Sequence, residues 1–215
     1  IVVKASLKYQ WVKEVEKFSD YKAKAIDTPS KAKKKFDNQF EDADLFILNY
    51  ETLKNEKVVQ KLREKDVEVM LYDEIHYINN HKSARAKAAY EFNDVKYIVG
   101  ATATPITNNP ENLFGIFNLI NKDLFFSFNK FAKSYIKYAG YGRVAGCKNE
   151  QHLRDKISPY VFIKSEEDVA DQLPTLVVNQ IYCELPPHMS EINAKLFEEL
   201  DNVRKEIEAL EKRYP

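Results

Sequence analysis

The sequence predicts an α/β fold in which a parallel sheet is covered on both faces by helices. Apolar segments rich in β-branched residues alternate along the chain with segments whose apolar residues recur at helical spacing. The apolar segments are nearly continuous in hydrophobicity, which is typical of parallel strands that are buried on both faces. Strands are therefore expected at residues 1–3, 22–27, 45–50, 67–72 and 95–101.

Helical segments occupy the stretches between these strands. The first, SLKYQWVKEVEKF at residues 6–18, carries its apolar residues at helical spacing: Leu7, Trp11, Val15 and Phe18. Ser6 is expected to cap the N-terminus of this helix, because its hydroxyl can accept a hydrogen bond from the first turn. Further helices are expected at residues 31–40, 53–65 and 83–92.

Beyond Pro110 the pattern becomes mostly helical. Helices are expected at residues 111–120, 127–138 and 151–157, followed by a strand at 175–185 and a long helix at 190–213 with a partial apolar stripe. The sequence thus predicts three parts. These are an α/β core at residues 1–125, a helical insertion at residues 126–158, and a return segment with the long helix at residues 159–215.

The composition suits a globular protein and gives only a weak indication of its partners. With 215 residues and 44% hydrophobic content, the chain can bury a sizeable core. Lys+Arg and Asp+Glu both number 33, but residues 1–40 contain ten Lys and only five acids. The leading part is therefore the better candidate for facing phosphates. The alternative is that KAKKK at residues 31–35 is a solvated helix face.

Other features bear on the compartment. No apolar run is long enough to span a bilayer, so no membrane association is expected. Cys147 and Cys183 stand alone, which predicts a reducing compartment without a structural disulfide or zinc site. The abundance of Lys, Asn, Tyr and Phe suggests a cytoplasmic protein of bacterial or phage origin, and a eukaryotic protein of this kind would be nuclear. The oligomeric state is left open.

A pair of carboxylates ends the apolar segment VEVMLY. Asp73 and Glu74 follow this strand directly, and ligands in open α/β sheets bind beyond the carboxyl ends of the strands. Mg²⁺ prefers one or two carboxylates together with waters and phosphates, and a second carboxylate can activate an attacking water. The pair therefore predicts phosphoryl chemistry, although it can also be a strand-end acid pair that faces solvent.

The next apolar strand ends in hydroxyl residues. In GATATPITNNPENLF, residues 100–114, Thr102 and Thr104 follow the strand, and Pro105 stops it. If this strand neighbours the strand that ends at the carboxylates, both threonines lie beside Asp73 and Glu74.

The residues DEIH followed by TATPITNN resemble motifs II and III of superfamily-two helicase-like ATPases, in particular the Swi/Snf branch of double-stranded DNA translocases. IVVKASLKYQWVKEVEKF resembles motif Ia of that branch, and FILNYETL resembles motif Ib. DEIHYINNHKSARAKA resembles the extended motif II, and ISPYVFIKSEEDVADQLP resembles the segment after the helical insertion. The resemblance covers nearly the whole chain and implies a RecA-like lobe of an ATP hydrolase.

The resemblance implies a role for each matching residue. Asp73 would hold Mg²⁺ on the phosphates of ATP, and Glu74 would activate the water that attacks the γ-phosphate. His76, Thr102 and Thr104 would couple the nucleotide state to the DNA-binding face and to a second RecA-like lobe.

The resemblance also implies contacts with duplex DNA. Ser6 and Lys8 in motif Ia, Tyr50 and Thr52 near motif Ib, and Asn80 after motif II would approach the nucleic-acid backbone. The alternatives are that Lys8 is a solvated helix lysine and that Tyr50 is a core aromatic. Tyr77 and Asn79 stand where the family commonly has a basic residue and a lysine, which removes positive charge from this contact.

One expected feature of an ATPase is missing. The glycines Gly100, Gly115, Gly140, Gly142 and Gly146 do not allow a G-x-x-x-x-G-K-[ST] phosphate loop to be drawn. The family places that loop before motif Ia, where this chain begins. The sequence is therefore expected to be a fragment that is inactive alone.

Two other functions remain open at this point. The D-E-x-H core is shared by restriction-type and RNA helicases, although PITNN and YETL favour the DNA translocases. A non-catalytic scaffold, which binds a protein partner through the long helix, is the third candidate. Metalloprotease chemistry is not expected, because the sequence contains no H-E-x-x-H motif.

Overall fold

The computed structural model describes residues 1–29, 36–104, 109–165, 168 and 186–213. The chain divides into two compact units, Ile1–Val161 and Phe162–Pro215, and each is described by itself. Within the described residues, no helix has the length and apolarity that crossing a membrane requires.

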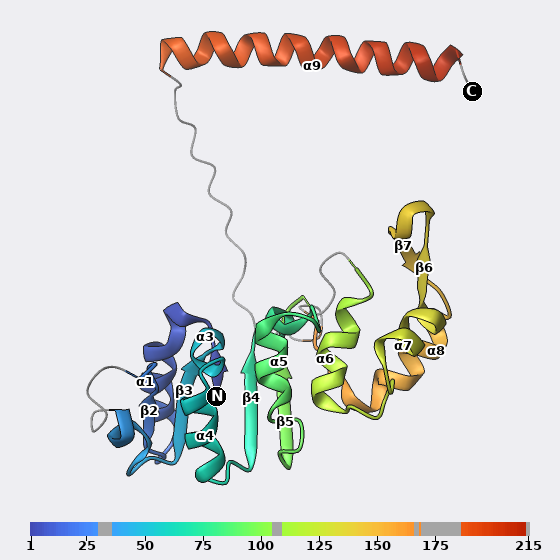
Figure 1. Ribbon diagram of the computed structural model, residues 1–215. Coiled ribbons are helices and arrows are strands. Elements are labelled where there is room, and N and C mark those ends of the chain that lie inside the picture. Colours follow the sequence, from blue (N-terminus) through green and yellow to red (C-terminus); the bar gives the residue numbers. More distant parts are fainter. Residues whose placement is uncertain (30–35, 105–108, 166–167, 169–185, 214–215) are drawn as a thin grey trace. The chain divides into compact units, whose positions relative to one another are not determined.

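The first unit is built on a parallel sheet flanked by helices, as the sequence predicts (Figure 1). Its strands have the spatial order β2-β3-β1-β4-β5. They are β1 (Val2–Val3), β2 (Ala23–Ala25), β3 (Leu45–Asn49), β4 (Val69–Asp73) and β5 (Tyr97–Ala101). All pairings between these strands are parallel, and β4 pairs with β5 from Val69↔Tyr97 to Asp73↔Ala101.

Most helices of the sheet region lie within the predicted segments, although the short helix at Tyr50–Leu53 was not expected. The helices of this region are α1 (Lys8–Phe18), α3 (Tyr50–Leu53), α4 (Glu56–Glu64) and α5 (Ala84–Tyr90), with short 3-10 turns η1 (Ala5–Leu7), η2 (Asn38–Phe40) and η3 (Ile75–Ile78). Asn49, Asn55 and Ser83 cap α3, α4 and α5 with their side chains. Of the helix expected at 31–40, residues 31–35 lie outside the described part of the chain.

The expected N-cap of the first helix is wrong. Ser6 lies inside η1, and α1 begins at Lys8 after Leu7, whose side chain cannot accept a hydrogen bond. The backbone N–H of Leu7 instead donates to the carbonyl of Lys4 at 2.9 Å, so a 3-10 turn replaces the side-chain cap.

The segment after β5 forms α6 (Asn112–Ile120), α7 (Phe128–Tyr135), α8 (Glu150–Ile157) and a β-hairpin of β6 (Ile136–Tyr138) and β7 (Val144–Cys147). Two further 3-10 turns, η4 (Gly140–Gly142) and η5 (Ser158–Tyr160), connect them. The helix expected at 127–138 therefore ends three residues early. Ile136 is 1% exposed and pairs with Cys147, so burial in the hairpin outweighs continuation of the helix.

The hydrophobic core of the first unit has two clusters. One fills the sheet region and includes Val2, Leu48 and Tyr72. The other joins α6, α7 and α8 through Phe114, Phe131 and other aromatic side chains. Gly115 lies where α6 crosses η3, and a Cβ atom there would stand 2.3 Å from the carbonyl oxygen of Asn79. The backbone of α6 at Gly115 therefore packs directly against the backbone of the turn that follows the carboxylate pair.

The second unit contains α9 (Pro187–Arg213), which confirms the expected long helix and extends its start to Pro187. The described members of its apolar stripe are exposed: Ile192, Leu196, Leu200, Val203 and Ile207. The strand expected at 175–185 lies outside the described residues, and the predicted boundaries at 125/126 and 158/159 stay predictions.

Candidate functional site

The two carboxylates lie at the carboxyl edge of the sheet, where β4 ends. Asp73 is the last residue of β4, and Glu74 has φ 52° and ψ 52°, a left-handed backbone that turns the chain into η3. Such a conformation is costly for a residue with a Cβ atom. The turn separates the two side chains, so Asp73 continues the strand while Glu74 belongs to the turn.

Glu74, His76 and Thr102 form a cluster of polar side chains. His76 Nδ1 lies 2.9 Å from Thr102 Oγ1 and 3.1 Å from Glu74 Oε2. Thr102 Oγ1 donates to Glu74 Oε2 at 3.3 Å. The threonine hydroxyl has one proton, and it donates this proton to Glu74. Nδ1 of His76 is therefore assigned as the N–H donor, and Oγ1 of Thr102 and Oε2 of Glu74 accept its hydrogen bonds. The expectation that Thr102 lies beside the carboxylates is confirmed.

Thr104 joins this cluster through its main chain. Its backbone N–H donates to Thr102 Oγ1 at 3.1 Å, while its own side chain is exposed. The structure therefore brings Glu74, His76, Thr102 and Thr104 together. The catalytic role of Glu74 and the coupling role of the other three residues stay predictions.

Asp73 is held by two aromatic residues from other elements. The indole Nε1–H of Trp11, on α1, donates to Asp73 Oδ2 at 3.3 Å. The hydroxyl of Tyr50, at the start of α3, donates to the carbonyl oxygen of Asp73 at 2.7 Å. Tyr50 is 4% exposed, and burial, followed by the negative charges of Asp73 and Glu74, raises its pKa far above the ordinary value. The alternative that Tyr50 is a core aromatic is confirmed.

The donor set at Asp73 fits a magnesium ion that shares its ligands with a nucleotide. Among the described residues no group of three His, Cys, Asp or Glu side chains could hold a metal alone. Mg²⁺ at phosphate sites needs only one or two carboxylates, because phosphates and waters complete its octahedral shell. Within the described part of the chain, Oδ1 of Asp73 makes no hydrogen bond, so it is available for such a role.

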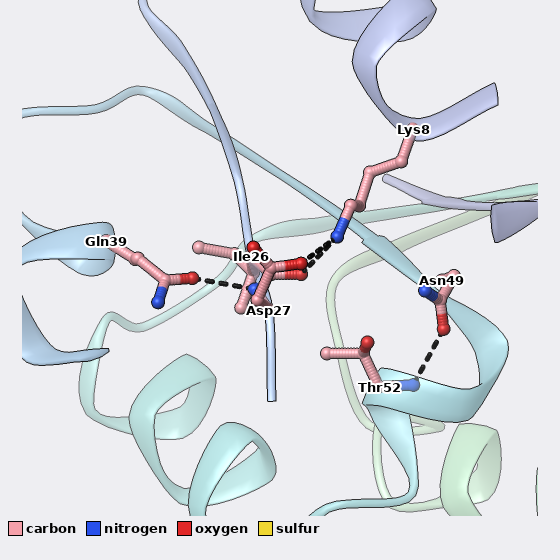
Figure 2. A network of polar contacts seen from close by, with 6 residues as sticks. All are labelled: Lys8, Ile26, Asp27, Gln39, Asn49 and Thr52. Carbon is pink, nitrogen blue, oxygen red and sulfur yellow. Dashed lines mark hydrogen bonds and ion pairs between the residues drawn. The ribbon is translucent and has the colours of Figure 1, made fainter. Parts of the chain in front are cut away.

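Lys8 lies in a polar network that joins α1 to β2 (Figure 2). Its ammonium donates to the carbonyl oxygen of Ile26 at 3.2 Å and forms an ion pair with Asp27. The backbone N–H of Asp27 in turn donates to Gln39 Oε1 at 2.6 Å. Lys8 is 5% exposed, so the alternative of a solvated helix lysine is wrong.

The five residues expected near the DNA backbone differ in accessibility. Lys8, Tyr50 and Thr52 are buried, and the backbone N–H of Thr52 donates to Asn49 Oδ1 at 2.8 Å (Figure 2). Ser6 and Asn80 are exposed, and Asn80 Oδ1 accepts from the backbone N–H of Lys82 at 3.0 Å. DNA contact by all five stays a prediction, and only Ser6 and Asn80 have exposed side chains here.

Sequence reasoning missed the role of Trp11. Its spacing with Leu7 and Val15 indicated only a helix, whereas the structure shows that its indole N–H donates to Asp73. A tryptophan near a candidate site offers one signal, because a buried indole N–H usually requires an acceptor.

Arg85 was also missed. Its Nε donates to Glu51 Oε1 at 2.6 Å, and its guanidinium lies 5.5 Å from the centroid of the Tyr77 ring. These contacts connect α5 to α3 and to η3, beside the site. Spacing alone could not reveal them, because Arg85 and Glu51 are distant in the sequence.

Comparisons with known proteins agree with this architecture. The chain is 27% identical over 212 residues to the DNA annealing helicase and endonuclease ZRANB3 of Mus musculus, which covers 93% of this chain and 20% of that protein. It is 27% identical over 156 residues to the TATA-binding protein-associated factor MOT1 of Saccharomyces cerevisiae, covering 68% of this chain and 8% of MOT1. An uncharacterized ATP-dependent helicase of Mycoplasma pneumoniae is 26% identical over 204 residues, covering 93% of this chain and 18% of that protein. The chain thus spans only a small part of each relative.

The solved structure of the Sulfolobus solfataricus SWI2/SNF2 ATPase core in complex with dsDNA has the same fold. It matches with a TM-score of 0.62 and 24% identity, over 94% of this chain and 41% of that one. The model of the SNF2-related domain matches residues 1–214. The chain therefore belongs to the SNF2-related domain family.

Proposed function

We propose that this chain supplies part of the first motor lobe of an ATP-dependent double-stranded DNA translocase. The observation that carries the proposal is the cluster of Glu74, His76 and Thr102 beside Asp73, at the carboxyl edge of the parallel sheet. In open α/β folds this edge is where phosphate ligands bind.

In this proposal each carboxylate has one task. Asp73 would hold Mg²⁺, which would neutralise charge on the phosphates of bound ATP. Glu74 orients the attacking water and accepts its proton. Because the hydrogen bonds from Thr102 and His76 both reach Oε2 of Glu74, its other oxygen is left to face the water. The protein then contributes to hydrolysis by positioning groups and by electrostatic stabilisation, and it forms no covalent bond to the nucleotide.

His76 and Thr102 couple the reaction to movement. Both contact Glu74, and Thr102 follows β5 while His76 lies in η3. A displacement of Glu74 would therefore be passed to two different elements. The remaining parts of the site, a phosphate-binding loop and a second RecA-like lobe, are expected from other parts of the full-length protein.

The proposed nucleic-acid partner is duplex DNA. The support is the family itself, a structural neighbour described as a complex with dsDNA, and relatives described as a DNA annealing helicase and a TATA-binding protein-associated factor. Contacts to the DNA backbone carry no base specificity, so binding is expected to weaken steeply with salt.

The proposal is tested by ATP turnover of the full-length protein with and without nucleic acid. We expect turnover to depend on Mg²⁺ and to be stimulated more by duplex DNA than by single strands. Glu74→Gln should lower turnover by roughly 100-fold or more, as the loss of a general base does. Glu68→Gln is the matched control, because Glu68 is exposed and precedes the opposite end of β4.

Other outcomes separate the competing functions. Stimulation by RNA rather than by duplex DNA would favour an RNA helicase. An absence of turnover under all of these conditions, with the protein folded, would contradict the motor function and favour a scaffold.

A further inference from the structure

Asp73 is fixed at two different atoms by two different elements. Trp11 on α1 binds the carboxylate, and Tyr50 at the start of α3 binds the main-chain carbonyl. The first bond restrains the side-chain rotamer, whereas the second restrains only the backbone at the end of β4. Loss of the Trp11 bond therefore frees the carboxylate that would bind a ligand, whereas loss of the Tyr50 bond loosens only the backbone at the end of β4.

The bond from Trp11 is selective for one oxygen. The indole Nε1–H is a donor only, and it reaches Oδ2 at 3.3 Å. In the described part of the chain, Oδ1 receives no hydrogen bond, so the carboxylate is held on one side and free on the other. A restrained carboxylate loses less rotational freedom when it binds a cation, and partners outside the ligand shell typically strengthen metal binding 10–100-fold.

We propose that Trp11 is a positioning residue for Asp73, whose indole N–H orients the carboxylate so that Oδ1 binds the magnesium ion of the nucleotide. The inference rests on the proposed function, because it assigns that ion to Asp73. It adds that the helix of motif Ia, in addition to any contact with DNA, sets the metal affinity of the site. A shift of α1 thus alters the affinity for Mg²⁺.

The first experiment asks whether the indole N–H is held by Asp73. Trp11 is the only tryptophan of this chain, so a ¹⁵N-labelled sample gives a single indole signal in a ¹H–¹⁵N correlation spectrum. Asp73→Ala should shift this signal and speed its exchange with water. The matched control is Tyr72→Phe, which removes a buried hydroxyl next to Asp73 that points to the carbonyl of Ala89 instead. An unchanged indole signal in Asp73→Ala overturns the proposal.

The second experiment measures metal affinity directly, without turnover. Mn²⁺ replaces Mg²⁺ as the probe, and electron paramagnetic resonance counts the free ion in the presence of ATP and the full-length protein. Trp11→Phe keeps an aromatic ring but removes the N–H, and it should weaken Mn²⁺ binding by about 10–100-fold. Tyr72→Phe should bind Mn²⁺ as the wild-type protein does.

A double-mutant comparison separates positioning from general destabilisation. If Trp11 acts through Asp73, Trp11→Phe causes no further loss of Mn²⁺ affinity in the Asp73→Ala background. Equal losses in both backgrounds overturn the proposal, and so does wild-type affinity in Trp11→Phe. If the wild-type protein itself binds no Mn²⁺ in the presence of ATP, the proposed function fails together with the role of Trp11. If the wild-type protein binds Mn²⁺ and Trp11→Phe binds it equally well, only the role of Trp11 fails.

Discussion

Thr102 Oγ1 lies 2.9 Å from Nδ1 of His76, so a contact between side chains joins the residue after β5 to the turn η3. The same hydroxyl donates to Glu74 Oε2 at 3.3 Å. One small residue thus touches both the candidate general base and the candidate coupling histidine.

The hydroxyl of Thr102 is expected to matter more than that of Thr104. Thr102→Val removes the bonds to Glu74 and His76 at nearly constant shape, and it should lower DNA-stimulated ATP turnover about 3–10-fold, which corresponds to one hydrogen bond. Thr104→Val should have a smaller effect, because Thr104 contacts the cluster through its backbone N–H. Steady-state turnover of both variants checks this order, and an equal loss in the two would contradict it.

The pair of Lys8 and Asp27 is expected to respond unequally to the loss of either partner. The Lys8 side chain is 6% exposed, whereas that of Asp27 is 56% exposed. Asp27→Ala removes the carboxylate partner of a buried ammonium and leaves it the carbonyl of Ile26 and the ring of Tyr9. It should lower the free energy of unfolding by roughly 1–3 kcal/mol. Lys8→Met leaves a carboxylate that water can solvate, and it should lower the free energy of unfolding by about 1 kcal/mol or less. Urea unfolding of both variants tests the asymmetry, and the reverse order would show that the ion pair does not dominate.

Gly115 is expected to tolerate no side chain. A Cβ atom there would stand 2.3 Å from the carbonyl oxygen of Asn79 and 2.6 Å from that of Ile78, and backbone atoms cannot move aside cheaply. Gly115→Ala should therefore lower the free energy of unfolding by about 1–3 kcal/mol and lower Tm by several degrees. Gly140→Ala is the control, because a Cβ atom at Gly140 meets nothing within 4 Å. Thermal unfolding monitored by circular dichroism compares the two, and similar melting temperatures would argue against close packing of α6 on η3.

The stability of the protein is expected to depend on the protonation of His81. Its ring stacks on Phe128 with centroids 4.3 Å apart and meets Phe114 edge-on at 5.1 Å. Burial, and next the charge of Lys82, lower the pKa of His81 below its ordinary value of 6.5. The unfolded chain therefore binds a proton at this histidine more readily than the folded protein does. The contribution of neutral His81 to the free energy of unfolding is fully present above about pH 6.5, and it is lost as pH falls through the folded pKa.

His81→Phe keeps an aromatic ring and removes the charge. Between pH 7.5 and 5.5 the wild-type protein should lose more free energy of unfolding than this variant, as measured by urea titration at each pH. Parallel losses in the two proteins would mean that other groups cause the pH dependence.

The sheet could be predicted because its strands are continuous apolar segments. The strands at 45–50, 67–72 and 95–101 were expected within a few residues, since continuous apolar segments are typical of parallel strands. The expected burial on both faces does not hold for β5, where Tyr97 and Val99 are exposed. The carboxylate pair and Thr102 followed from the same rule, because the carboxyl ends of neighbouring parallel strands share one edge.

The rest depended on contacts between distant residues. The sequence left open whether Tyr50 is a core aromatic and whether Lys8 is solvated. The structure decides both, because the Tyr50 hydroxyl donates to the carbonyl of Asp73 and the Lys8 ammonium is buried against Asp27. The helix expected at 127–138 gave way to a strand because Ile136 finds a pairing partner in Cys147. Partners that are chosen by the tertiary fold leave no trace in local spacing.

The left-handed backbone of Glu74 has a consequence for protein engineering. L-residues with a Cβ atom adopt this conformation at a cost of about 1–2 kcal/mol, whereas glycine adopts it freely. A library selected only for heat resistance should therefore accumulate Gly or Asn at this position, and under the proposed role of Glu74 as general base such variants lose ATP turnover. Selection for turnover has to be applied alongside selection for thermal tolerance if the carboxylate is to survive.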